Sequence, residues 1–126
     1  MSPPRISTLS DLFPLLIRDP FMLQPKTPEA CTSLTDIRAG IDFHDRQIFE
    51  ALVKRLGYVK AAVQFKANEQ AIPAPERVAA MLQDRLEWAA SEGFDAQFIE
   101  QLYTLIIHWN IDQQIQHWRS IHGEKA

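Results

Sequence analysis

Several features that are common in small proteins are scarce or missing in this chain of 126 residues. A lone cysteine, Cys31, excludes an internal disulfide framework and a cysteine-rich zinc module, and it favours a reducing compartment. The 13 basic residues are outnumbered by 16 acidic ones, which argues against a nucleic-acid-binding protein. No apolar run approaches the roughly 18–20 residues that cross a bilayer, or the roughly 7–15 of a signal-peptide core. We therefore expect a cytoplasmic protein with no membrane or nucleic-acid partner.

Strand signals are nearly absent as well, because no alternating segment is bounded by Asn-Gly or Asp-Gly turns. Prolines are confined to two places: six of the eight lie within the first 28 residues, and the others are Pro73 and Pro75. An interior proline costs a helix about 3 kcal/mol, so long helices are restricted to 29–72 and 76–126. Apolar residues recur there at three- and four-residue steps. The predicted fold class is all-α.

Three helices and one extension are expected. The first helix covers about 33–67, with Thr32 or Ser33 as its cap, and a loop covers 67–74. The second opens near Pro75 and closes at Gly93, and the third runs from 95 to about 121. Residues 1–25 form an irregular extension to a helical domain over 26–126. Two interpretations of the extension stay open: the natural start lies near Met22, or the leucines 12, 15 and 16 form a helical turn that docks on the domain.

The length of the first helix predicts a second chain. A helix of roughly 34 residues is about 50 Å long, whereas a compact 100-residue domain has a radius of gyration of about 13 Å. The two shorter helices cannot cover its apolar stripe along that length. We therefore predict a two-fold homodimer.

Polar residues on apolar helical faces are the candidate site. Arg55 interrupts the apolar stripe of the first helix, and Lys66 continues the line of that stripe. Arg38 lies between two apolar positions of the same helix, and Gln114 lies between two apolar positions of the third helix. Because a buried cation without a partner is costly, this pattern predicts a pocket for an anion. The alternative is that Arg38 and Lys66 extend to water and Gln114 is a satisfied core amide.

Spacing indicates how such a pocket is built. Arg38 and Arg55 are 17 positions apart, about 25 Å along a helix, so one chain cannot bring both to a small molecule. Arg55 and Lys66 are 11 positions apart and nearly in phase on the first helix, so their long side chains can converge on a ligand between them. Antiparallel crossing of two first helices would bring Arg38 of one chain to Arg55 and Lys66 of the other. A site shared between two chains is predicted.

Other catalytic motifs are missing. The sequence has no glycine-rich phosphate loop, no serine or cysteine nucleophile in a recognisable setting, and no metal-binding histidine motif. We therefore expect an anion site that uses neither a cofactor nor a metal.

Seven short segments of the chain form a recognisable pattern: Lys26-Thr27-Pro28-Glu29, Asp36-Ile37-Arg38, Ile41-Asp42, Tyr58-Val59-Lys60-Ala61-Ala62, Phe65-Lys66-Ala67, Ile72-Pro73-Ala74-Pro75-Glu76-Arg77-Val78 and Ile106-Ile107-His108-Trp109. Through them the chain, from Lys26 to about Arg119, resembles the isochorismate pyruvate lyases of bacterial salicylate biosynthesis, a branch of the AroQ-type chorismate mutase superfamily. The resemblance implies a three-helix fold with a long first helix, assembled as an intertwined homodimer with shared sites.

The resemblance also implies a role for each candidate residue. Arg38 of one chain and Arg55 of the other would hold the carboxylates of a dianionic small molecule, isochorismate or chorismate. Lys66 would reach a carboxylate and the ether oxygen, Gln114 would face that oxygen, and Arg77 would be a second-tier contact. The implied reaction is isochorismate to salicylate and pyruvate by a concerted hydrogen transfer, in salicylate and siderophore biosynthesis.

Position 78 favours the lyase. Typical AroQ mutases carry a carboxylate directly after the arginine of the second helix, whereas Arg77 is followed here by Val78. A weak chorismate mutase side activity is still expected, because the same cations would bind chorismate. The alternatives are a dedicated chorismate mutase and an inactive dimeric binding module.

Overall fold

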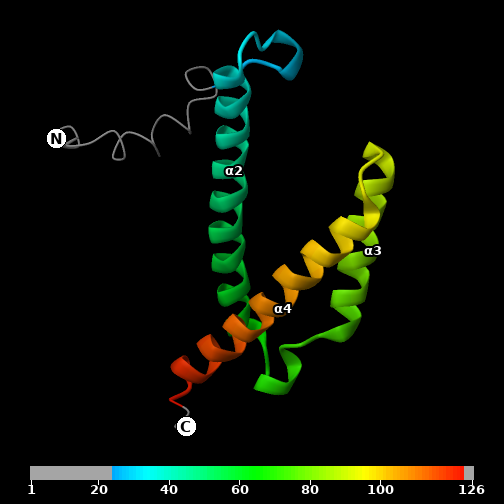
Figure 1. The fold of residues 1–126 in the computed structure, drawn as a ribbon. Helices are drawn as coiled ribbons and strands as arrows, with labels where there is room; N and C mark the ends of the chain where they lie inside the picture. Colours follow the sequence, from blue (N-terminus) through cyan, green and yellow to red (C-terminus); the bar gives the residue numbers. More distant parts are fainter. Residues whose placement is uncertain (1–23, 124–126) are drawn as a thin grey trace, which may run out of the picture. The chain divides into compact units, whose positions relative to one another are not determined.

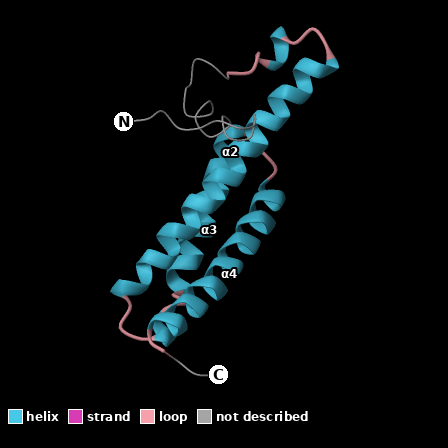
Figure 2. Cartoon of the chain, turned by 90° about the vertical axis from the view of Figure 1, so that its left-hand side faces the viewer, coloured by secondary structure: helices cyan, strands magenta, loops and turns pink. Residues whose placement is uncertain are grey.

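The structure is a computed structural model that describes residues 24–123. Regular structure in this range is helical throughout, without a strand (Figure 2), so the predicted all-α class is confirmed. The main elements are α2 (Leu34–Ala61), α3 (Pro75–Glu92) and α4 (Ala96–Ile121). Three short 3-10 turns accompany them: η1 (Pro28–Ala30), η2 (Ala62–Phe65) and η3 (Glu69–Ala71). Residues 1–23 of the predicted extension, which include Met22 and leucines 12, 15 and 16, lie outside the described residues.

Contacts divide the chain into two units, with the boundary between Leu52 and Val53 inside α2. In the first unit, the start of α2 is fixed by side chains. The Ser33 hydroxyl accepts a hydrogen bond from the Asp36 amide at 3.1 Å. The Asp36 carboxylate accepts bonds from the Thr32 amide and from Lys26 Nζ, both at 3.1 Å. Ser33 therefore caps the helix, as predicted.

α2 has no buried residue. Its apolar stripe is open in the single chain: Ile41 and Ile48 keep 55% and 59% of their surface exposed. A long helix with an exposed apolar stripe is stable in water only when another apolar surface packs against that stripe.

The second unit is built around a hairpin of α3 and α4, which lie side by side (Figure 1). Pro75 opens α3, and Gly93 ends it in the left-handed conformation at φ 62°. The Phe94 amide then donates to the Ala89 carbonyl at 2.8 Å, and the Asp95 side chain caps α4 by accepting from the Phe98 amide at 3.0 Å. These boundaries match the prediction, because each is set by a residue with a strong local preference.

The end of α2 differs from the prediction. The helix stops at Ala61 instead of continuing to Ala67, tightens into η2, and becomes extended at Lys66. The reason is tertiary: Val63 is buried in the small core with Ile72, Ala89 and Ile107, and α4 contacts both η2 and η3. The segment therefore packs against α4 rather than prolonging the first helix.

Candidate functional site

A cavity of about 340 Å³ lies in the second unit, where α2 ends and α3 and α4 meet. This volume is within the range of small-molecule sites, about 300–1,000 Å³. Its walls come from four parts of the chain and comprise Arg55, Tyr58, Val59, Ala62, Ile72, Pro73, Arg77, Val78, Met81, Arg85, Ile107, Asn110, Ile111 and Gln114.

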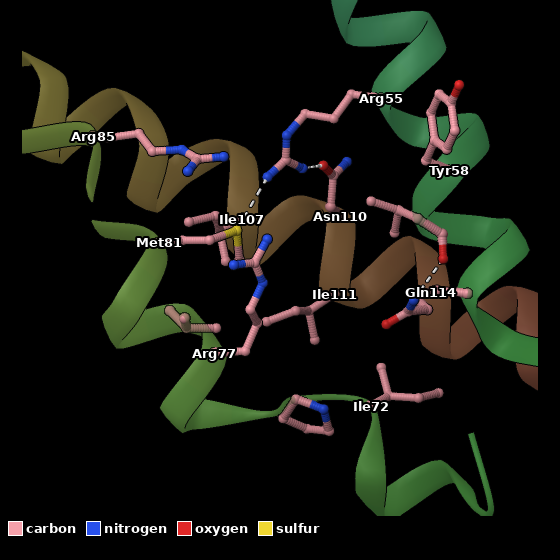
Figure 3. Close-up of a pocket in the computed structure, with 14 residues that line it drawn as sticks. Arg55, Tyr58, Ile72, Arg77, Met81, Arg85, Ile107, Asn110, Ile111 and Gln114 are labelled. Carbon is pink, nitrogen blue, oxygen red and sulfur yellow. Dashed lines mark hydrogen bonds between the residues drawn. The ribbon is translucent and has the colours of Figure 1, made fainter. Parts of the chain in front are cut away.

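Three arginines line the cavity, and no acidic residue is among its lining residues. Arg55 comes from α2, and Arg77 and Arg85 from α3. Their guanidinium groups point toward the same part of the cavity, around Met81 (Figure 3). This concentration of positive charge in a partly apolar hollow is suited to a small organic anion.

Arg55 is held at its tip by two neutral groups. Nη1 donates to Asn110 Oδ1, and Nη2 lies 3.8 Å from the sulfur of Met81. Burial lowers the pKa of Arg55, and the neighbouring charges of Arg85 and Arg77 lower it further. Arginine still keeps its charge at neutral pH because its pKa starts so high. The site therefore holds a cation whose charge an incoming anion would stabilise.

Arg85 is held in place by three neighbouring side chains, one acidic and two aromatic. Nη1 pairs with Asp84 at 2.8 Å, and the guanidinium lies over the ring of Trp88 at 4.5 Å and near that of Tyr103 at 5.7 Å. Nε is buried without a hydrogen-bond partner. Stacking and the ion pair thus orient this side chain toward the cavity before any ligand arrives.

Gln114 is buried, with 7% of its surface exposed, and links α4 to the end of α2. Its Nε2 donates to the Val59 carbonyl at 2.5 Å. An amide nitrogen carries two hydrogens, so one N–H and the side-chain carbonyl stay available for a ligand. Gln114 is therefore both a structural link and a wall of the cavity.

The five predicted site residues are brought together only in part. Arg55, Arg77 and Gln114 line the cavity, whereas Arg38 and Lys66 do not. Arg38 lies in the first unit and is exposed. The prediction that Arg55 and Lys66 lie in phase on one helix is wrong, because α2 ends before Lys66.

Lys66 lies at the start of the loop that connects η2 to α3. It lines a second hollow with Lys60 and His117, and its Nζ is 3.5 Å from the Ala71 carbonyl. The next turn of this loop is tied to α4 by Arg119, whose Nη2 is 2.5 Å from Glu69 Oε1. Ala62 and Ile72, which precede and follow Lys66 in the chain, both line the cavity. Lys66 is therefore close to the cavity in sequence, although it does not line it.

Asn110 and Arg85 also belong to the cavity, and the sequence analysis selected neither of them. Asn110 could have been found, because it lies three positions after Ile107 and four before Gln114, in the same helical row. Arg85 gave no comparable signal, since it is one of several charged residues on α3. Its role depends on the packing of α3 against α4.

The rest of the wall is apolar and includes Ile72, Val78, Ile107 and Ile111. An arrangement of this kind is suited to a small molecule whose anionic groups meet the arginines and whose apolar part meets the aliphatic side chains. Within residues 24–123, no three side chains of histidine, cysteine, aspartate or glutamate gather where they could hold a metal ion. None of the helices in that range has the length and apolar character needed to cross a membrane.

Comparison with known proteins gives two matches. The family model for chorismate mutase type II matches residues 37–115. Over 98 residues the chain is 58% identical to an isochorismate pyruvate lyase of Pseudomonas aeruginosa, an alignment that covers 78% of this chain and 97% of that protein.

Proposed function

Because this chain belongs to the chorismate mutase type II family, we propose that it is an isochorismate pyruvate lyase with a weak chorismate mutase side activity. The observation that carries the proposal is an arginine-lined cavity, free of acidic residues, in a chain 58% identical to a protein of that name. Isochorismate carries two carboxylates and a ring, which the arginines and the aliphatic wall would hold. The reaction yields salicylate and pyruvate.

The reaction needs no group from the protein to take or give a proton. A ring hydrogen passes to the methylene carbon of the enolpyruvyl side chain as the ether C–O bond breaks, and the ring becomes aromatic. The protein has to fold the flexible side chain over the ring, an effect worth up to about 7–11 kcal/mol in favourable intramolecular reactions. It also has to stabilise the charge that develops on the ether oxygen. Arg55, with Arg38 of a partner chain and Arg77 as a second-tier contact, would perform the first task, and Lys66 with Gln114 the second.

Val78 supports the lyase over a dedicated mutase. It lines the cavity directly after Arg77, at the position where typical AroQ mutases carry a carboxylate. An acid there would face three arginines and reduce the net positive charge that attracts the substrate. The apolar side chain would instead pack against a ring that becomes aromatic during the reaction.

The experiment that tests this function is a parallel assay with isochorismate and chorismate, following salicylate fluorescence and prephenate. We expect rapid salicylate formation and little prephenate. Dominant prephenate would establish a mutase instead, and neither product would favour a binding module. A Val78→Glu variant tests the role of the apolar residue in the same assay. We expect its kcat/KM for isochorismate to be at least about tenfold lower, because the acid neutralises part of the positive charge in the cavity.

The active unit that we propose is a homodimer. The open stripe of α2, a 28-residue helix without a buried residue, supports this, because a second copy of α2 would cover it. Antiparallel crossing of the two helices would also bring Arg38 of one chain to the cavity of the other. Each of the two sites would then contain Arg38 from one protomer and Arg55 from its partner.

Mixed dimers test the shared site. Arg38→Ala and Arg55→Ala chains are each expected to be inactive, but a dimer of one with the other has one intact site. Random mixing after unfolding and refolding should therefore recover about a quarter of the wild-type activity. Recovery of none would show that both arginines act within one chain.

Lys66 would enter the site by movement of its loop. The contact of its Nζ with the Ala71 carbonyl is long and exposed, so little holds the ammonium in its present position. Closing the loop over bound substrate would exclude water and bring the charge to the ether oxygen. Limited proteolysis should cut residues 67–74 more slowly when salicylate and pyruvate are present, and equal cutting would contradict the closure.

We propose that the protein is cytoplasmic. The single cysteine donates a weak bond to the Thr27 carbonyl and is a free thiol, as is common in reducing compartments.

A further inference from the structure

Arg55 is held differently from four other cations in the described part of the chain. Lys26, Arg46, Arg85 and Arg119 each pair with a carboxylate, respectively Asp36, Glu50, Asp84 and Glu69. Arg55 instead donates to an amide oxygen and a thioether sulfur (Figure 3). Neither acceptor carries a charge, so the guanidinium is oriented without being neutralised.

Asn110 is well placed to give that orientation. It is 5% exposed and lies on α4 between Ile107 and Gln114, both of which are also buried. Surrounding side chains therefore restrict its rotamer, and its carbonyl oxygen meets the guanidinium at one fixed point. A buried amide oxygen without a donor would be costly, so the folded state favours this contact.

The choice of an amide has an electrostatic consequence. An aspartate at the same position has nearly the same shape and would bind Arg55 more strongly. It would also compete with a substrate carboxylate for the same cation, because one guanidinium cannot be fully available to two anions. Burial and the charges of Arg85 and Arg77 already disfavour the ionised form of Arg55 and lower its pKa. The charged Arg55 therefore reduces the stability of the fold.

We propose that Asn110 is a positioning residue for Arg55: its neutral carbonyl fixes the guanidinium and leaves the positive charge available for a substrate carboxylate. The identity of that carboxylate, on isochorismate, rests on the proposed function. The positioning itself requires only that the cavity binds an anion.

The first test is Asn110→Asp, which keeps the acceptor and adds a charge. We expect KM for isochorismate to rise about 10- to 150-fold, the range for losing a hydrogen bond to a charged group, while kcat changes by less than about threefold. Thermal stability should be unchanged or higher, since the new carboxylate pairs with Arg55. Gln83→Glu, an amide-to-acid change at an exposed position of α3, is the matched control and should leave both constants unchanged.

The second test is Asn110→Ala, which removes the acceptor without adding charge. Here we expect the main loss in kcat, about tenfold, because the guanidinium no longer holds the substrate in one orientation. Met81→Leu should change kcat less than about threefold, because a thioether is a weak acceptor.

Three results would overturn the proposal. These are a folded Asn110→Asp protein with wild-type KM, an Asn110→Asp protein that fails to fold, and an Asn110→Ala protein with wild-type kcat. Calorimetric binding of chorismate to the same variants separates this question from the proposed function. If the wild type makes no salicylate but Asn110→Asp weakens chorismate binding at least about tenfold, the lyase assignment fails and the positioning role stands.

Discussion

Replacing Arg55 with methionine should separate stability from activity. Methionine keeps much of the aliphatic length of arginine and removes the cation. The substitution leaves Asn110 Oδ1 without its donor in a buried position, which costs about 1–3 kcal/mol. It also removes a partly buried cation and its repulsion with Arg85 and Arg77, which offsets part of that cost. We therefore expect the free energy of unfolding to fall by less than about 3 kcal/mol.

Activity should respond quite differently. Truncating one partner of a hydrogen-bonded charge pair costs about 2–5 kcal/mol, so kcat/KM for isochorismate should fall by roughly 30- to 5,000-fold. The assay is the initial rate of salicylate fluorescence, with urea unfolding measured at the same protein concentration. Arg46→Met is the control on the same helix, since it removes a surface ion pair with Glu50 and should cost about 0.3–0.5 kcal/mol without changing kcat/KM.

The reasoning would be refuted by an Arg55→Met protein whose kcat/KM stays within fivefold of the wild type. It would also be refuted by a loss of stability above about 3 kcal/mol, because Arg55 would then be a structural residue. Either result would remove the basis for treating the cavity as an anion site.

Three further predictions concern the loop, a helix cap and the acid side of the stability curve. Lys66→Ala should reduce salicylate formation by about 10²–10³-fold and leave the mass of the assembly in light scattering unchanged; a normal rate would contradict its role. Asp95→Ala should lower the free energy of unfolding by about 1 kcal/mol in urea titrations, because the Phe98 amide loses its acceptor. The pKa of Asp36 is lowered by the Thr32 amide and by Lys26, so its stabilisation is present above pH 3.8 and is lost as the pH falls further. Asp36→Asn should therefore flatten the dependence of the melting temperature on pH below about 4, and an unchanged slope would show that this carboxylate does not contribute.

The sequence predicts some parts of this fold better than others for a physical reason. The ends of α3 and the start of α4 are set by Pro75, Gly93 and Asp95, each of which acts on its own few residues. The end of α2 has no such local signal. It depends on the burial of Val63 and on the bond from Gln114 to the Val59 carbonyl, which joins residues 55 positions apart.

The candidate site follows the same division. Arg55 and Gln114 could be identified because a polar residue in an apolar row is visible in the sequence. The same rule applied to α4 would have found Asn110. Arg85 could not be found in this way, because only the packed hairpin brings it to the cavity beside Arg55. The position of Lys66 likewise depends on where α2 stops.

The uncovered stripe of α2 has a consequence for how the protein behaves at different concentrations. If a second chain supplies the missing cover, formation of the native state requires an encounter between two molecules, and its extent depends on total protein. The melting temperature should then rise with concentration. The rate per chain should fall when a stock solution is diluted below the dissociation constant of the assembly. Synthesis of the chain in the cell would have to exceed that threshold before any product formed, so output would rise more steeply than the amount of protein.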